Sequence, residues 1–342
     1  VRGGVCDLLG WRYPWYSPAV WHREIGAVCD GIIADVGAKL SPWAMMGAPP
    51  RHGKSLHVGE TTGPRMMALR PGASVLYATS TDDRVLDVSR AARDMVCALY
   101  ETGRYPHLAP HPRGPWTTDR WRTAGGNDWF GVGAGVATGG IGADLIVVDD
   151  ATGSDARQAS PAWKRTTRRW LEGDVLTRGR SGAGVILMET RRGLDDLQGY
   201  AAEQWPGRWS VHTWACKRAD GSYLWPEEYG ADWHAQQPQL APGTRVWETQ
   251  YQQRPTREGG SVILEAWTAH RYPGPARAAR SSCPQVWIVV DPAGKTAERN
   301  DPSGVGVVGL RADGVVMVLH MEAVRRDYPG LRQRVTDLAA EW

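Results

Sequence analysis

The 342-residue chain lacks the features that mark secreted, membrane-spanning or zinc-binding proteins. Its five cysteines are scattered without a C-x-x-C pair, so neither a zinc site nor a disulfide framework follows, and a reduced intracellular protein is the simplest interpretation. No apolar run approaches the roughly 18 residues that a membrane helix needs. No charged-then-apolar leader opens the sequence either. We therefore expect an intracellular protein that is neither secreted nor inserted in a membrane.

Lysine and phenylalanine are also scarce. Of the 40 basic residues only five are lysines, and 18 tryptophans contrast with a single phenylalanine. This usage suggests a GC-rich coding sequence more than selection for arginine chemistry, and a net charge of +3 does not by itself indicate a nucleic-acid partner. The guanidinium fork does suit phosphate contacts, so a DNA partner stays open.

Apolar runs of strand length alternate with helical patterns over the first 215 residues, which is typical of α/β proteins. Runs such as 143–150 (ADLIVVDD) are apolar without alternation, as expected of strands covered on both faces of a parallel sheet. The expected strands are 43–48, 73–80, 129–134, 143–150, 184–190 and 209–214, and the expected helices are 54–69, 82–101, 160–176 and 194–204.

The composition changes after residue 215, where prolines separate polar and aromatic segments. The stretch 272–284 (YPGPARAARSSCP) is typical of a linker. Three apolar runs follow and precede a helical pattern, which predicts the order β-β-β-α. These elements are expected at 286–291, 304–310, 314–321 and 328–341.

The stretch 48–55, APPRHGKS, is close to the phosphate-binding pattern G-x-x-x-x-G-K-[ST] but lacks its first glycine. In such loops backbone N–H groups and a helix N-terminus cradle the β and γ phosphates, the lysine neutralises them, and the hydroxyl holds Mg²⁺. Gly53, Lys54 and Ser55 lie where that chemistry requires, between an expected strand and an expected helix. The tripeptide alone could also occur by chance beside an ordinary proline turn.

A second motif favours a nucleotide site. A hydrolase of this class needs a strand that ends in acids, one for Mg²⁺ and one to polarise water. About ninety residues after the loop, the run 143–150 ends in Asp149 and Asp150. Two such motifs in the right setting and order are accidental much less often than either one alone. We therefore predict that the tips carrying Lys54 and Asp149 lie side by side on neighbouring strands and hold one magnesium triphosphate.

At this point the chain resembles a known family, the large terminase subunit of tailed bacteriophages, the motor that packages DNA. The family's loop often reads P-P-R-H-G-K-S, so residues 49–55 match it and the missing glycine is dispensable in this variant. PPRHGKS together with YQQRP is quite specific. The resemblance covers most of the chain in the family's order, continuing through 131–150, 182–200, 251–260 (YQQRPTREGG) and 286–309.

The resemblance implies an α/β fold: a RecA-like, additional-strand P-loop ATPase with a mainly parallel sheet, followed by a partial ribonuclease H-like domain. It implies ATP-driven packaging of double-stranded viral DNA into procapsids in the host cytoplasm, with endonuclease cleavage of concatemers by the complete protein. The implied partners are the DNA, the portal protein, the small terminase subunit and further copies in a ring. The implied parts are an N-terminal helical, adenine-side segment (1–40), the ATPase core (41–215), a linker region (216–284) and the nuclease part (285–342).

Carried over position by position, the resemblance assigns roles in the phosphate site. Lys54 would contact the β and γ phosphates, Ser55 would ligate Mg²⁺, and Asp149 would hold the metal directly or through water. Asp150 takes the place of the catalytic carboxylate, which is Glu in many relatives. Arg51 could stabilise charge on the transferring phosphoryl group, or it could be a turn-exposed arginine. The implied nucleotide-binding loop also contains Pro50, His52 and Gly53.

Two further stretches depart from the family's pattern. Thr190 matches the coupling position, where a hydroxyl can sense the γ phosphate, but the stretch 190–197 (TRRGLDDL) lacks the Trp-His pair of the common T-R-W-H-x-D-D-L. His22, within 21–25 (WHREI), lies where relatives often carry a glutamine that reads the adenine edge. A ring nitrogen could substitute, although a plain amphipathic helix explains this stretch equally well.

The helix expected at 160–176 is a candidate DNA contact. Cations at spacing i, i+1, i+4 and i+5 lie on one side of a helix and could follow a DNA backbone, whose affinity is mainly phosphate neutralisation. Such runs are more usually solvated faces. The four residues are Lys164, Arg165, Arg168 and Arg169.

The ribonuclease H-like part would hold two metal ions, Mg²⁺ or Mn²⁺, about 4 Å apart by acids from several strands. Asp291 matches the first of these acids, unless it only begins an Asp-Pro turn, and Asp301 matches a nearby acid. Glu322 follows the third strand and fits less well. Family members continue past the last helix with further acids, so we expect weak or no DNA cleavage by this chain. The rival interpretations are a helicase-like DNA-remodelling ATPase and a catalytically defective prophage remnant or DNA-binding scaffold.

Overall fold

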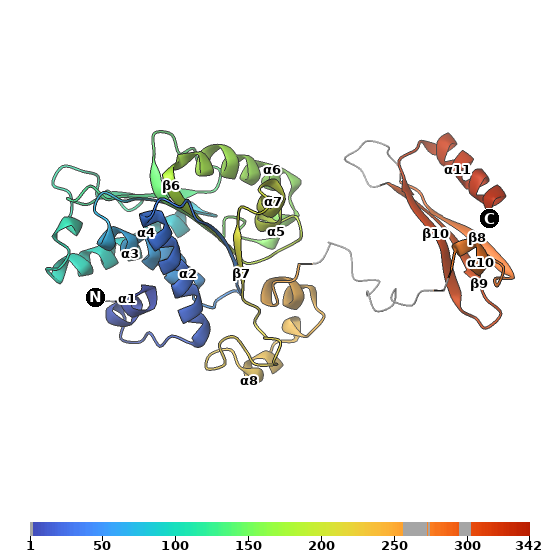
Figure 1. Cartoon of the computed structure of the whole chain (residues 1–342), viewed down its shortest axis with the longest axis horizontal. Helices are drawn as coiled ribbons and strands as arrows, with labels where there is room; N and C mark the ends of the chain where they lie inside the picture. Colours follow the sequence, from blue (N-terminus) through green and yellow to red (C-terminus); the bar gives the residue numbers. More distant parts are fainter. Residues whose placement is uncertain (1–2, 256–271, 273, 294–301) are drawn as a thin grey trace. The chain divides into compact units, whose positions relative to one another are not determined.

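The computed structural model describes residues 3–255, 272, 274–293 and 302–342. The chain divides into two compact units, Val1–Ser261 and Val262–Trp342 (Figure 1). Among the described residues, no helix combines the length and apolar character that a membrane crossing requires. The predicted nuclease residue Asp301 lies outside the described residues.

A seven-stranded sheet forms the centre of the first unit, with the strand order β3-β4-β2-β5-β6-β1-β7. All neighbouring pairs are parallel except β3 and β4, which are antiparallel. The predicted α/β class with a mainly parallel sheet is therefore confirmed. The strands are β1 (Trp43–Gly47), β2 (Ser74–Thr79), β3 (Arg120–Arg122), β4 (Asp128–Gly133), β5 (Ala143–Asp149), β6 (Gly179–Glu189) and β7 (Ser210–Thr213).

Helices cover both faces of this sheet (Figure 1). Alternate strand residues face two separate cores: Met46 and Tyr77 pack with α1 to α4, whereas Met45 and Leu76 pack with α6 and α7. Every residue of β2 is buried, which explains why such runs are apolar without alternation. The helices are α1 (Val5–Arg12), α2 (Val20–Gly37), α3 (Thr62–Leu69), α4 (Asp82–Glu101), α5 (Asp155–Ala159), α6 (Pro161–Trp170) and α7 (Leu197–Gln204).

Local sequence signals set where three of these helices begin. The Thr81 side chain caps α4, and the acids that follow it in the first turn suit the positive end of the helix dipole. Ser160 caps α6, with Pro161 at the first helical position, where its missing N–H costs nothing. Asp196 caps α7 by accepting a hydrogen bond from Gly199 N at 2.9 Å. Two of the capped termini, those of α4 and α7, face the site described below.

Residues 216–255, the first described part of the expected linker region (216–284), pack as part of the first unit. This segment contains α8 (Ala231–Ala235) and a small core formed by Cys216, Leu240 and Trp247. Just before it, Trp214 N donates to Gly47 O at 2.8 Å, at the end of β1. The segment therefore lies against the loop that follows β1.

The second unit contains a three-stranded antiparallel sheet in the order β10-β9-β8. Its core includes Val305 and Val307 of the middle strand and Leu331 and Leu338 of the last helix. The order β-β-β-α is the one predicted from the sequence. The elements are α10 (Ala276–Arg280), β8 (Gln285–Asp291), β9 (Ser303–Leu310), β10 (Val316–Val324) and α11 (Tyr328–Glu341).

Candidate functional site

The loop after β1 leads directly into a helix. The chain leaves the strand at Gly47, turns through residues 48–53 and becomes helical at Lys54. Gly53 has φ 81°, a left-handed conformation that favours glycine, and a Cβ added there would lie 3.3 Å from His22 Nε2. Glycine at position 53 of the motif therefore suits both the left-handed backbone and the close approach of His22.

Lys54 ties together the ends of two strands. Its buried ammonium donates to Ala48 O and Pro49 O at 2.9 Å each and to Thr190 Oγ1 at 2.5 Å. Burial lowers the pKa of Lys54 to about 8, while the carboxylates of Asp150 and Asp149 act in the opposite direction. A buried ammonium that faces two acids is well placed to receive a polyanion.

Asp149 ends β5 and is fully buried. Its Oδ2 accepts a hydrogen bond from Tyr77 Oη at 3.0 Å, and its backbone oxygen accepts one from Thr79 Oγ1 at 2.6 Å. Its Oδ1 is buried without a partner. Burial raises the pKa of Asp149, and Arg84 and the Ser55 hydroxyl lower it. A buried carboxylate oxygen without a donor is costly, and together with the Ser55 hydroxyl it supplies the oxygen ligands that Mg²⁺ prefers.

The expectation that the tips of Lys54 and Asp149 lie on neighbouring strands is wrong. Strand β6 lies between them, pairing with β1 through Gly47↔Glu189 and with β5 through Asp149↔Met188. The two tips still share one site because Thr190, the residue after β6, accepts the hydrogen bond from Lys54. The intervening strand therefore places the predicted coupling residue between the two motifs.

Two acids lie beside this junction. Asp150 has φ 50°, donates its backbone N–H to Met188 O at 2.8 Å, and lies 3.5 Å from Arg192 Nη2. Glu189, which the sequence motifs do not single out, is buried and accepts from Thr152 N at 3.4 Å. Burial raises the pKa of Glu189 well above its usual value, and the neighbouring Asp150 adds to this effect. The site therefore pairs a partly exposed carboxylate with a buried carboxyl group that favours its protonated form.

The segment after Thr190 connects the site to other parts of the first unit. Asp196 Oδ2 accepts from Arg191 Nε at 2.8 Å and from Arg192 N at 2.9 Å. Arg191 N donates to Gln253 Oε1 at 3.4 Å, so the YQQRP motif contacts this segment. Gln253 has φ 56°, an uncommon conformation for a residue other than glycine. The departure from the family's pattern thus leaves a dense hydrogen-bond network in place of the Trp-His pair.

The four cations of α6 do not act as one surface. Lys164 Nζ donates to Asp195 Oδ2 at 2.7 Å, and Arg168 Nη2 donates to Asp195 O at 2.7 Å. Arg165 and Arg169 are exposed. Half of the predicted DNA-contact set therefore joins α6 to the segment after Thr190, and the other half faces solvent.

A pocket of about 410 Å³ opens beside the loop. Its lining includes Tyr16, His22, Gly53 and Trp225, with two glutamates, 227 and 228, among the other residues. His22 Nδ1 accepts from Ala19 N at 3.0 Å, and His22 Nε2 lies 3.2 Å from His52 O. Burial lowers the pKa of His22 to about 4, so the ring is neutral and both of its nitrogens already have partners. The adenine base of a nucleotide in this pocket would contact aromatic rings and the edge of His22 rather than a free ring nitrogen.

The remaining loop residues are held by the segment that precedes α8. Tyr229 Oη donates to Arg51 O at 3.3 Å. The Arg51 backbone has φ 60°, and its side chain is exposed. His52 is buried, packs against the Tyr229 ring at 4.7 Å and bonds Pro50 O through Nδ1 at 2.8 Å. These contacts fix the loop, and leave the Arg51 side chain accessible.

No family model matches the sequence, and no curated protein matches it either. The chain is similar to large terminases of bacteriophages. The large terminase of bacteriophage HK97 is 15% identical with a TM-score of 0.39, over 85% of this chain and 61% of that one. The ATPase domain of the Thermus phage P74-26 large terminase is 15% identical with a TM-score of 0.42, over 73% and 96%. The large terminase of another thermophilic bacteriophage, solved in complex with ATP-γ-S, is 12% identical with a TM-score of 0.38, over 90% and 70%.

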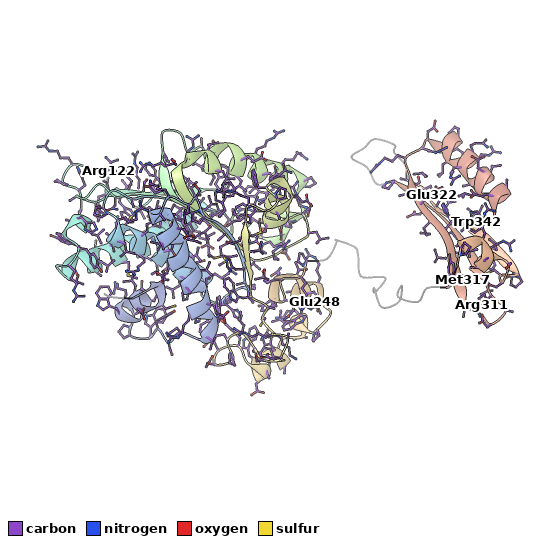
Figure 2. The ribbon with its side chains drawn as sticks, viewed as in Figure 1. Arg122, Glu248, Arg311, Met317, Glu322 and Trp342 are labelled. Atoms are coloured by element: carbon purple, nitrogen blue, oxygen red, sulfur yellow. The ribbon has the colours of Figure 1, made fainter. Side chains whose placement is uncertain are left out.

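The sequence resemblance also predicted metal-binding acids in the second unit. Asp291, at the end of β8, is exposed and pairs across the sheet with Gly304. Glu322 on β10, labelled in Figure 2, accepts from Arg334 at 2.6 and 3.0 Å, and this partner lowers its pKa. Within the described ranges no cluster of three or more His, Cys, Asp or Glu side chains could hold a metal ion. The two-metal site at Asp291 and Asp301 therefore stays a prediction.

Proposed function

We propose that the first unit binds and hydrolyses Mg²⁺-ATP, and that the complete protein uses this hydrolysis to move double-stranded viral DNA into procapsids. One observation supports the proposal above the others. Lys54 and Asp149, from two distant motifs, both lie at the carboxyl ends of the strands β1, β6 and β5, on either side of Thr190. The portal protein, the small terminase subunit and further copies in a ring would be its partners, as in the family that the motifs suggest.

The chain's own groups support phosphoryl transfer. Lys54 brings a positive charge to the β and γ phosphates once they replace its carbonyl partners, Ala48 and Pro49. Bound Mg²⁺, held by Ser55 and Asp149, would neutralise charge on the transferring group. Asp150 is partly exposed at the same edge and can orient the attacking water. Its short side chain would be aided by Arg192, which holds the carboxylate in place.

Thr190 can report the state of the phosphate site because its hydroxyl accepts directly from Lys54. Through the segment that follows it, the signal would reach Asp195 and then α6, where Arg165 and Arg169 are free to follow a DNA backbone. A second route runs through Asp155, which accepts from Arg192 at 3.1 Å and from Gln250 at 3.0 Å, just before the YQQRP motif.

The direct test is phosphate release by the full chain with and without double-stranded DNA. We expect ATP turnover that rises when DNA is added and that excess ATP-γ-S suppresses. Turnover at background level under both conditions would leave the remnant or scaffold interpretation standing. Strand separation by the chain would instead favour the helicase-like rival.

Replacing Asp195 by alanine should uncouple DNA from hydrolysis. The change removes the carboxylate that accepts from Lys164 and Gln158, while the backbone oxygen that accepts from Arg168 stays. It removes no group from the phosphate site. We expect basal ATP turnover to be retained and the stimulation by DNA to fall at least about fivefold, the lower end of typical coupling between sites. The matched control is Glu203→Ala, an exposed acid on α7. Equal stimulation in the two variants would exclude this route.

A further inference from the structure

Arg84 reaches the phosphate site from the first turn of α4. Its backbone N–H donates to the helix cap, Thr81 Oγ1, at 3.4 Å, so the position of its backbone is set by the cap. Its side chain is partly exposed, and Nη2 donates to Ser55 Oγ at 2.8 Å. Among the described residues Ser55 is its one side-chain hydrogen-bond partner. The guanidinium is thus held to the phosphate loop by a single hydrogen bond.

The acids of the site act on the same guanidinium. Burial lowers the pKa of Arg84, but Asp149, with further contributions that include Asp150 and Glu60, raises it. In return Arg84 lowers the pKa of Asp149 and of Glu60, although burial, aided by Asp149, still raises that of Glu60 to about 7. Arg84 therefore supplies positive charge to the group of acids that surrounds the proposed metal ligands.

A divalent cation would compete with this arrangement. Ser55 and Asp149, the residues that would hold Mg²⁺, are the hydroxyl that Arg84 binds and the carboxylate that it screens. Asp149 Oδ1 has no hydrogen-bond partner, so the site can accept a metal without breaking a bond to Asp149. Two cations beside one carboxylate repel each other, and the repulsion is strongest where water is excluded. Arg84 is the cation that can leave, because Lys54 is buried and held by three bonds.

We propose that Arg84 is a second arginine of the phosphate site that exchanges with the metal: it rests on Ser55 in the nucleotide-free protein and moves onto the triphosphate when Mg²⁺ occupies Ser55 and Asp149. This inference rests on the proposed ATP site. It gives the site a cation that disfavours the bare metal ion and favours the metal together with its nucleotide. The anionic triphosphate, with its many acceptor oxygens, is the partner that suits a displaced guanidinium.

The test is a titration of the nucleotide-free full chain with Mn²⁺, followed by electron paramagnetic resonance. We expect Arg84→Ala to bind Mn²⁺ about tenfold more tightly than the wild type, within the usual range of coupling between two sites. ATP-γ-S binding at saturating Mg²⁺ should weaken by a similar factor in the same variant. Arg84→Lys should restore part of both effects, because it keeps the charge but loses the fork.

Two control variants define the result. Arg90→Ala removes an exposed arginine of the same helix that pairs with Asp87, and it should behave as the wild type. Asp149→Asn should remove the tightest Mn²⁺ binding, which shows that the titration reports this site. Unchanged or weaker Mn²⁺ binding by Arg84→Ala, or equal changes in Arg90→Ala, would overturn the proposal. A wild type without ATP turnover whose Arg84→Ala variant still binds Mn²⁺ more tightly would reject the proposed function and keep the exchange.

Discussion

Replacing Lys54 by alanine should reduce ATP turnover at least about 10²-fold, the usual effect of removing a group that stabilises transition-state charge. The reason is geometric: the ammonium lies at the meeting point of β1 and β6 and is the buried cation that faces Asp149 and Asp150. Alanine also leaves the Thr190 hydroxyl without its donor, so any DNA stimulation should disappear together with the basal rate.

The control for this variant is Lys39→Ala, which removes an exposed ammonium that donates to Ser181 O at 3.4 Å. Phosphate release by the two variants and the wild type should be compared at equal concentration. Circular dichroism would check that all three are folded. If Lys54→Ala and Lys39→Ala turned over ATP at equal rates, the phosphate-site assignment would be lost.

The same lysine predicts a pH dependence. Burial lowers the pKa of Lys54 to about 8 in the nucleotide-free protein, so its ammonium form is lost as the pH rises through that value. ATP binding to the wild type should therefore weaken above about pH 8, whereas binding to Lys54→Ala should be weak and lack this step. Fluorescence titrations with a labelled ATP analogue at pH 7 and pH 9 would measure the difference.

Elements that depend on local pattern could be predicted from the sequence. The strand around 143–149 is a continuous apolar run because helices cover both of its faces, and Lys54 and Ser55 follow a loop whose chemistry is contained in eight consecutive residues. The helix expected at 82–101 is confirmed as α4, whose first-turn acids suit the helix dipole. In each case the physical cause lies within a few residues of the feature.

Features that depend on strand pairing could not be predicted in this way. The position of β6 between β1 and β5 is a long-range choice, and no local pattern in residues 179–189 reveals it. Arg84 contacts Ser55, which is 29 residues away in the sequence, so no local sequence pattern indicates this contact. The two acids before Arg84 are explained by the helix dipole alone. Glu189 is one acid within an apolar run, a pattern that in hindsight marks a buried ionisable group next to a site.

The site also pays a stability cost that a single substitution should reveal. Replacing Asp149 by asparagine should reduce ATP turnover about 10²-fold or more, and yet raise the melting temperature of the first unit. Asparagine keeps an acceptor for Tyr77 Oη and removes the negative charge that burial penalises. Each kcal/mol recovered by removing this buried charge should raise the melting temperature by about 2–4 °C in a unit of this size.

The pH dependence of that gain follows from the direction of the pKa shift. Burial raises the pKa of Asp149 above its ordinary value of 3.8, so the folded protein binds this proton more tightly than the unfolded chain does. The stability that Asp149 contributes is therefore complete below that ordinary value and is lost as the pH rises through the folded pKa. Calorimetry should show Asp149→Asn to be more stable than the wild type at pH 7, with a difference that shrinks toward pH 4. A variant that is inactive and also less stable at pH 7 would mean that Asp149 stabilises the fold rather than serving as a metal ligand.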